Sequence, residues 1–220
     1  MIPACGSSTY PNTIMLNYAI LIDGGFVKRR LATFEKPLSA SDVSRLVEAI
    51  ASHTVLKHKL LYRTYFYDAP PLSKTVNVPL QGGKLNLGDT QLAKHNNQLH
   101  KELTNQDCFS LRMGEVQFRK NWQLDRATLD TNKDKLEITA KDLKPNIQKK
   151  GVDMRIGLDI ASLVLKKQVS LIVLVTGDSD FVPPMKFARR EGAQFAIAAL
   201  GHRIHQDLIE HTDYSLQLDI

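Results

Sequence analysis

The alternation of apolar runs with helical segments in residues 149–218 is the feature that most constrains the fold. The segment SLIVLVTGD (170–178) holds five consecutive aliphatic residues, which is typical of a strand buried on both faces. Its neighbours VDMRIGLDIASLVLKKQ (152–168) and SDFVPPMKFARREG (179–192) are predicted to be helices, and Gly192 closes the second. A strand in AQFAIAAL, a short helix in HRIHQDLIEH and a strand in YSLQLDI follow. This order predicts a mainly parallel sheet covered by helices on both faces.

Weaker patterns of the same kind occupy the first two thirds of the chain. The predicted elements are strands in 18–22, 59–68 and 108–118 and helices in 39–56 and 90–103. Asp23 follows the first strand, and Ser41 is the expected N-cap of the first helix. Residues 119–150 are polar, rich in lysine and without clear periodicity. We interpret them as an insertion or a flexible excursion.

Length, charge and cysteine content narrow the class of protein. With 220 residues, the chain is expected to form a loose leader over 1–16 and a single domain over 17–220. The formal net charge of +6 favours an anionic partner such as nucleic acid. The two cysteines form no motif, which fits a reducing compartment. The N-terminus lacks the pattern of a signal peptide, and no segment approaches the roughly 18 apolar residues of a membrane span. We therefore predict a cytoplasmic protein without membrane contact.

Four aspartates occupy positions that one edge of such a sheet would bring together. Asp23 follows the strand 18–22, and Asp178 follows the strand 171–175. If both strands are central and parallel, the two carboxylates emerge at the same edge. Asp153 lies in the first turn of the next predicted helix, and Asp180 lies just after Asp178. Carboxylates at such a short separation repel one another unless a cation neutralises them, and Mg²⁺ or Mn²⁺ prefers oxygen ligands.

Each aspartate also has a purely structural interpretation. An Asp after a strand often caps a helix or forms a turn, and an Asp in a first helical turn favours the helix dipole. Strand order decides between the interpretations, and the pattern leaves it open. Asp159 lies six residues after Asp153, which is about 240° around a helix at about 100° per residue. We expect Asp159 near the cleft, either as a further ligand or as a neighbour of the ligands.

Motifs of several other enzyme classes are absent from the sequence. There is no G-x-x-x-x-G-K-[ST] or G-x-G-x-x-G loop for nucleotide phosphates and no H-E-x-x-H zinc motif. The G-x-S-x-G turn of serine hydrolases is also absent, and GDSDF is too short for a calcium loop. Acidic metal chemistry is the pattern that remains.

Three segments together resemble the NYN domain family, specifically its LabA-like branch in the PIN-like nuclease superfamily: AILIDGGF (19–26), KKGVDMRIGLDIASLVL (149–165) and LIVLVTGDSDFVPPMKFARREG (171–192). The resemblance implies a three-layer α/β/α sandwich with PIN-like fold and a ribonuclease activity that depends on Mg²⁺ or Mn²⁺. Residues 69–148 match no motif of the family that we recognise.

The family's acidic residues transfer to this chain by motif. The matching positions are Asp23, Asp153, Asp178 and Asp180, and Asp159 matches a recurrent acid of the LabA-like branch. The resemblance thus implies that the first four are catalytic metal ligands. Many relatives have an Asn shortly after the first Asp, where this chain has Gly24, Gly25 and Phe26.

Basic residues flank the predicted cleft in the sequence: Lys28, Arg29, Arg30, Lys149, Lys150 and Arg155. Among them, Lys149 and Lys150 are the first candidates for phosphate contacts, followed by Lys28 and Arg155. Backbone amides near Ser179 would add a contact if a helix begins there. The alternative is a solvated basic surface.

Two classes of function follow. The first is a ribonuclease in which aspartates bind Mg²⁺ or Mn²⁺ and an activated water attacks the phosphodiester. The second is a non-catalytic regulator with the same fold that binds nucleic acid or a protein partner. A phosphatase acting on small phosphoesters is a third, less favoured interpretation. RNA is the expected partner, and the pattern leaves open a homo-oligomer or a protein partner.

Overall fold

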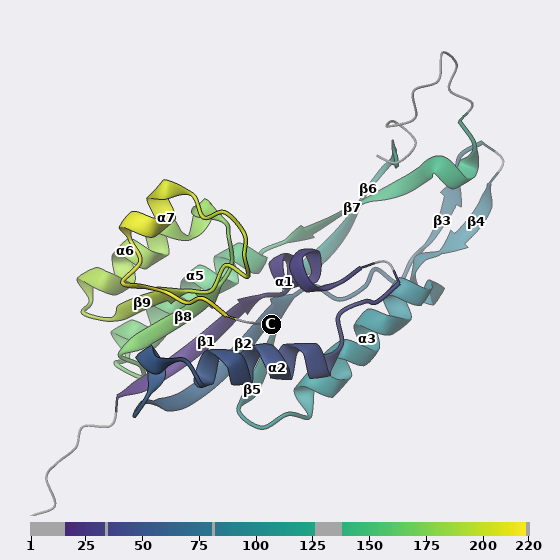
Figure 1. Cartoon of the computed structure of the whole chain (residues 1–220). Helices are drawn as coiled ribbons and strands as arrows, with labels where there is room; N and C mark the ends of the chain where they lie inside the picture. Colours follow the sequence, from purple (N-terminus) through teal and green to yellow (C-terminus); the bar gives the residue numbers. More distant parts are fainter. Residues whose placement is uncertain (1–15, 34, 81, 126–137, 219–220) are drawn as a thin grey trace, which may run out of the picture.

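A computed structural model of the chain describes residues 16–33, 35–80, 82–125 and 138–218 (Figure 1). Its centre is a sheet of six strands in the order β10-β9-β8-β1-β2-β5, in which every neighbouring pair is parallel. The strands are β1 (Asn17–Asp23), β2 (Leu60–Asp68), β5 (Phe109–Met113), β8 (Leu171–Val175), β9 (Gln194–Ile197) and β10 (Tyr214–Ser215). The prediction of a mainly parallel sheet is confirmed.

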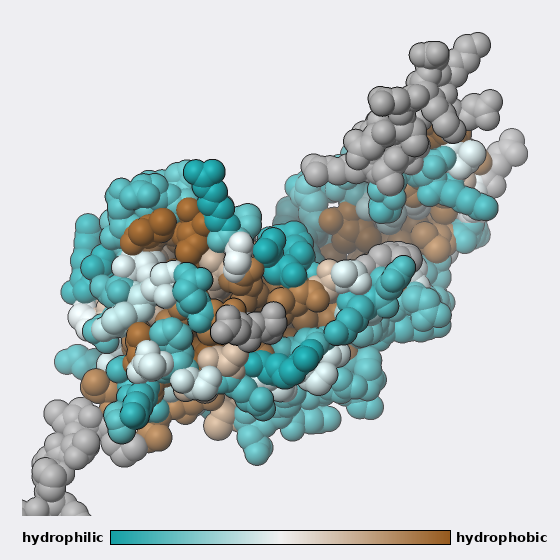
Figure 2. Space-filling model, viewed as in Figure 1, coloured by the Kyte–Doolittle hydropathy of each residue, from teal (hydrophilic) through white to brown (hydrophobic). Residues whose placement is uncertain are grey.

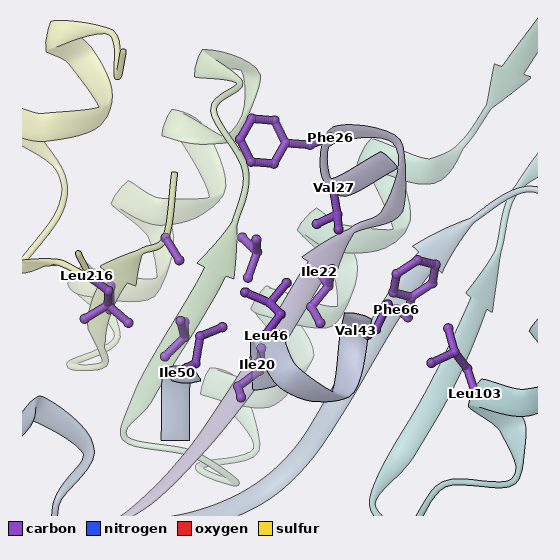
Figure 3. Close-up of a cluster of buried hydrophobic side chains, with 14 of the residues drawn as sticks. Ile20, Ile22, Phe26, Val27, Val43, Leu46, Ile50, Phe66, Leu103 and Leu216 are labelled. Carbon is purple, nitrogen blue, oxygen red and sulfur yellow. The ribbon is translucent and has the colours of Figure 1, made fainter. Parts of the chain in front are cut away.

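Helices cover both faces of this sheet. One face carries α1 (Gly24–Leu31), α2 (Ala40–Ala51) and α3 (Gln91–Thr104), and the other carries α5 (Val152–Leu165), α6 (Val182–Arg190) and α7 (Gln206–Glu210). Successive side chains of a strand alternate between faces, so Ile20 and Ile22 of β1 face the first layer and Ala19 and Leu21 the second. Figure 3 shows Ile20 and Ile22 near Leu46 of α2. The predicted three-layer α/β/α arrangement is thereby confirmed.

The order of the strands reverses beside β1. The chain runs from β1 through α1 and α2 to β2 on one side, whereas β8, which follows α5, pairs with the other side of β1. In open parallel sheets such a reversal leaves a crevice beyond the carboxyl ends of the two strands. Asp23 ends β1, and Asp178 follows β8 by three residues. The fold therefore directs both aspartates to this crevice.

Residues 69–148 add two antiparallel strand pairs to the core elements α3 and β5. The first pair is β3 (Thr75–Val78) with β4 (Gly83–Asn86), and the second is β6 (Glu115–Leu124) with β7 (Leu143–Lys150). In Figure 1, β6 and β7 extend together away from the six-stranded sheet, toward β3 and β4. The predicted excursion over 119–150 thus leaves the core, but its described ends are paired strands; residues 126–137 lie outside the described residues.

Two local predictions are wrong. The strand predicted over 108–118 is two strands, β5 and β6, separated at Gly114. A Cβ at Gly114 would lie 2.6 Å from the carbonyl oxygen of Lys150, so only glycine lets the chain cross there. The N-cap of α2 is Ser39 rather than Ser41, because Ser39 and Asp42 form a reciprocal capping box.

The visible surface is mainly hydrophilic over the helices. Figure 2 shows teal residues along the outer sides of α2 and α3, with brown residues gathered nearer the centre of the view. Within the part of the chain that the structure describes, no helix has the length and apolar character needed to cross a membrane.

Candidate active site

Asp23 lies at the junction of β1 and α1, where it caps the helix. Its Oδ1 accepts hydrogen bonds from the backbone N–H groups of Gly25 (2.9 Å) and Phe26 (3.1 Å). The helix can begin directly after the strand because Gly24 has no Cβ; an added Cβ would lie 2.6 Å from the carbonyl oxygen of Tyr67. No described residue donates to the other carboxylate oxygen of Asp23. The cap therefore fixes this side chain and leaves one oxygen for a ligand.

Asp178 and Asp180 share a short turn after β8. Asp178 caps the 3₁₀ helix η4 (Ser179–Phe181), because its Oδ1 accepts from the backbone N–H of Asp180 at 3.0 Å. Its own N–H donates to Oγ1 of Thr176, which is fully buried. Both aspartates are exposed. The capping interpretation of Asp178 is confirmed, and the cap holds the turn while both side chains reach solvent.

Asp153 lies in the first turn of α5, as predicted. The residue before that helix, Gly151, has a φ of 72°, a backbone conformation that favours glycine. Arg155 donates from Nη1 to the carbonyl oxygen of Gly151 at 3.0 Å, which holds this guanidinium against its own helix start. Asp153 itself is exposed.

The charges of these aspartates act on one another. Partial desolvation raises the pKa of Asp153 although the residue is exposed, the charges of Asp178 and Asp180 raise it further, and Arg29 lowers it. Burial also raises the pKa of Asp23, with a smaller upward contribution from Asp153. The two backbone N–H groups at Asp23 and the charge of Arg29 oppose that rise. Asp153 therefore lies within electrostatic reach of Asp23, Asp178 and Asp180, which come from two other segments of the chain.

The donor atoms suit a hard divalent cation. All four candidates offer carboxylate oxygens, the ligands that Mg²⁺ and Mn²⁺ prefer. In the described ranges, however, no three His, Cys, Asp or Glu side chains are gathered closely enough to hold an ion as they stand. Asp153, Asp178 and Asp180 are exposed, so changes of rotamer are open to them. The residues fit such an ion in chemistry, and the side chains are not arranged around one.

Asp159 is occupied by other partners. Its Oδ2 accepts hydrogen bonds from the hydroxyl of Tyr67 and from Nε of Arg112, both at 2.9 Å. The Arg112 guanidinium also lies over the ring of Tyr65, 5.1 Å from its centroid. The negative charge of Asp159 is thus balanced by Arg112 of β5, and its carboxylate is also bound by Tyr67 of β2. The structure does not bring it together with the other four aspartates.

A further aspartate, Asp68, ends β2 and escaped the sequence analysis. Its side chain is fully buried and is bound by Lys28 (2.5 Å), Lys149 (2.6 Å) and His100 (2.8 Å). Burial alone would raise the pKa of Asp68, but the His100 hydrogen bond and the two ammonium groups more than offset it, so this pKa lies well below its usual value. The available signal was the segment YFYDAP, a strand that ends in Asp as the first strand does.

The predicted phosphate contacts fall into two groups. The ammonium groups of Lys28 and Lys149 are held by Asp68, and Lys28 also donates to Oδ1 of Asn96 at 2.5 Å. Lys150 is exposed at the end of β7, while Ser179 lies in the turn between Asp178 and Asp180. The substrate-binding roles of these residues and of Arg155 stay predictions.

The observations so far define an α/β protein with a parallel sheet in which Asp23 and Asp178 lie at or just beyond the carboxyl ends of the two neighbouring strands where the strand order reverses. Residues 17–219 match the NYN domain family, and the chain belongs to it. That family has a PIN-like nuclease fold, which supports a nuclease-type function. The matched range includes residues 69–148.

The fold also resembles a solved structure. A protein of unknown function from Vibrio parahaemolyticus has a TM-score of 0.51 at 17% identity, over 93% of this chain and 94% of that chain. At this identity the likeness concerns the fold alone. No curated protein matches the chain at a significant level.

Proposed function

We propose that the chain is a ribonuclease of the LabA-like branch of the NYN family, dependent on Mg²⁺ or Mn²⁺. Its reaction centre would be the acidic cluster, which we define as Asp23, Asp153, Asp178 and Asp180. The observation that carries the proposal is geometric: Asp23 ends β1 and Asp178 follows the neighbouring parallel strand β8 at the same edge of the sheet, and Asp153 interacts electrostatically with Asp23, Asp178 and Asp180. Gathering like charges costs free energy, and a surface that only held an anionic strand would gain nothing from it.

The acidic cluster would also hold the ion. Asp23, through the oxygen that no described residue binds, and the exposed Asp153, Asp178 and Asp180 are the proposed ligands. A bound Mg²⁺ or Mn²⁺ would supply Lewis-acid stabilisation of a phosphodiester and ionisation of a water molecule. Asp159 is proposed to act on the site only indirectly, because Tyr67 and Arg112 bind it.

Groups around the acidic cluster would orient the carboxylates and bind the phosphates of the RNA strand. The helix cap at Asp23 fixes that carboxylate through two backbone N–H groups and lowers the cost of orienting it. Arg29, whose charge reaches Asp23 and Asp153, would attract the phosphate that the four carboxylates repel. Lys150 and the turn at Ser179 would contact neighbouring phosphates. These roles orient the strand for hydrolysis of one phosphodiester bond.

A non-catalytic regulator is the second candidate. One observation favours it: among the described residues, no three potential ligands are arranged around a common point. If the side chains do not gather around an ion, the fold would bind RNA or a protein partner without cutting RNA.

The deciding experiment incubates labelled single-stranded RNA with the purified protein, with and without millimolar Mn²⁺. We expect cleavage that requires the ion and that falls about a hundredfold or more in Asp178→Asn, since a lost anionic ligand removes several kcal/mol of transition-state stabilisation. RNA binding by the variant should be unchanged or tighter, because a negative charge has gone.

The matched control is Asp107→Asn, an exposed carboxylate that lies just before β5 and thus at the opposite edge of the sheet. Its cleavage rate should equal that of the wild type. Equal rates in wild type and Asp178→Asn would refute the proposed centre, and RNA binding without cleavage by all three proteins would favour the regulator.

A further inference from the structure

A cavity opens next to the acidic cluster. It has a volume of about 1230 Å³ and lies between α1 and the segment from His202 to Gln217. Of the acidic cluster, only Asp178 reaches its wall. Asp153 and Asp180 instead line a separate groove of about 520 Å³, which they share with apolar residues of α5 and α6. The acidic cluster thus lies between two hollows of different character.

The larger cavity carries an excess of positive charge. Arg29, Arg30 and Arg203 line it, and among the described residues Asp178 is its one acidic lining residue. Arg30 donates from Nη2 to the carbonyl oxygen of Leu200 at 3.1 Å, which holds the turn before His202 against α1. The guanidinium groups of Arg29 and Arg203 form no hydrogen bond with any residue in the described part of the chain. Two planar, forked donors are therefore available to an anion in this cavity.

An aromatic pair forms another part of the wall. The rings of Phe26 and His202 meet edge to face, with centroids 6.0 Å apart and an interplanar angle of 72°. They meet over Gly177, the second residue after β8, where an added Cβ would lie 2.6 Å from His202 and 2.9 Å from Phe26. Glycine at this position is what lets both rings reach the carboxyl end of β8. Phe26 is buried whereas His202 is exposed, so the cavity combines guanidinium groups with the imidazole ring of His202.

We propose that this cavity binds a nucleotide of the RNA strand adjacent to the bond that is cut, with Arg29 and Arg203 on its phosphate and the exposed ring of His202, which packs on Phe26, against its base. Arginine is well suited to the phosphate because its planar fork matches two phosphate oxygens. Aromatic rings stack on bases without regard to sequence. The volume lies above the roughly 300–1,000 Å³ of usual ligand pockets, which suits part of a polymer better than an isolated small molecule.

This inference rests on the proposed function, because it assumes that RNA reaches the acidic cluster. It assigns the nucleotide next to the cleaved bond to the cavity lined by Arg29 and Arg203, which needs no metal ion to bind it. Binding can therefore be measured when cleavage is blocked, and the two proposals can fail separately.

The test measures binding in EDTA by fluorescence anisotropy of a labelled single-stranded RNA hexamer. Arg203→Ala removes a guanidinium that lines the cavity and lies outside the acidic cluster, and it should weaken hexamer binding about tenfold, the range of one charge-assisted contact. Arg190→Ala is the matched control, because Arg190 is exposed on α6 and lies outside the cavity. The control should bind as the wild type does, and both variants should melt at the wild-type temperature.

A competition experiment distinguishes an RNA strand from a free nucleotide as the ligand that supplies the phosphate. Uridine 5′-monophosphate should displace the hexamer weakly from the wild type, and uridine should displace it far less. Equal hexamer binding by Arg203→Ala and wild type would overturn the proposal, whether or not RNA is cleaved in Mn²⁺. If uridine 5′-monophosphate bound as tightly as the hexamer, the cavity would be a site for free nucleotides, and the subsite assignment would be wrong.

Discussion

Replacement of Asp68 by asparagine tests the charge cluster that joins the ribbon of β6 and β7 to the sheet. The Asp68 carboxylate, fully buried at the end of β2, binds Lys28 of α1 and Lys149 of β7. Lys149 lies four residues before Asp153 in the sequence. The ion pair therefore fixes the strand that leads into α5 and thereby the position of Asp153.

The magnitude follows from the burial of the group and its partners. Removal of one member of a buried ion pair costs about 3–5 kcal/mol, because the remaining charge loses its partner. Here the side chains of Lys28 and Lys149 are 20% and 44% exposed, so both ammonium groups can turn toward water. We therefore expect Asp68→Asn to lower the free energy of unfolding by about 3 kcal/mol, near the bottom of that range. For a chain of this size the loss corresponds to a fall of about 6–12 °C in melting temperature.

The dependence on pH identifies charge as the cause. The pKa of Asp68 is lowered in the folded state, so its contribution is fully present above the unfolded pKa of about 3.9 and is lost as pH falls toward the folded value. The difference between wild type and Asp68→Asn should thus be fully present at pH 7. It should then shrink by about 1.4 kcal/mol for each pH unit below about 3.9.

Urea denaturation followed by circular dichroism measures this difference at pH 7 and at pH 3. Asp107→Asn serves as the control, since it removes the same charge at an exposed position and should change stability by less than about 0.5 kcal/mol. A loss of under 1 kcal/mol for Asp68→Asn at pH 7 would refute the reasoning. So would an equal loss at both pH values, because the effect would then come from packing.

Three further predictions concern the candidate site. Millimolar Mn²⁺ should raise the melting temperature of the wild type, because a ligand bound only by the folded state stabilises it; thermal denaturation of Asp178→Asn should show little of this rise. Gly177→Ala should displace His202 from Phe26, since the added Cβ would lie 2.6 Å from the imidazole, and this should weaken hexamer binding in EDTA. Lys150→Ala should reduce the slope of log affinity for RNA against log salt by about 1, and an unchanged slope would assign Lys150 to solvated surface.

Local patterns in the sequence were sufficient to predict the layered fold. The continuous apolar run 171–175 and the helical spacing around it record burial on both faces, which depends on residues close together in the chain. Similarly, the positions of Asp23 and Asp178 directly after strands could be read locally. These signals predicted a mainly parallel sheet between two layers of helices and aspartates at the carboxyl ends of two strands.

Tertiary structure decided which of these groups meet. Strand order placed β8 beside β1, and no spacing within either segment specifies that neighbour. Long-range pairing also determined charge compensation: Asp68 is bound by residues 32, 40 and 81 positions away, and Asp159 by residues 47 and 92 positions away. A sequence pattern records the period of an element, whereas the partners of a buried charge depend on how the whole chain buries its apolar surface. For that reason the sequence by itself determined the layers and the carboxylates at the strand ends. The tertiary structure decided that Asp153 lies within electrostatic reach of Asp23, Asp178 and Asp180, while Asp68 and Asp159 are bound by other side chains.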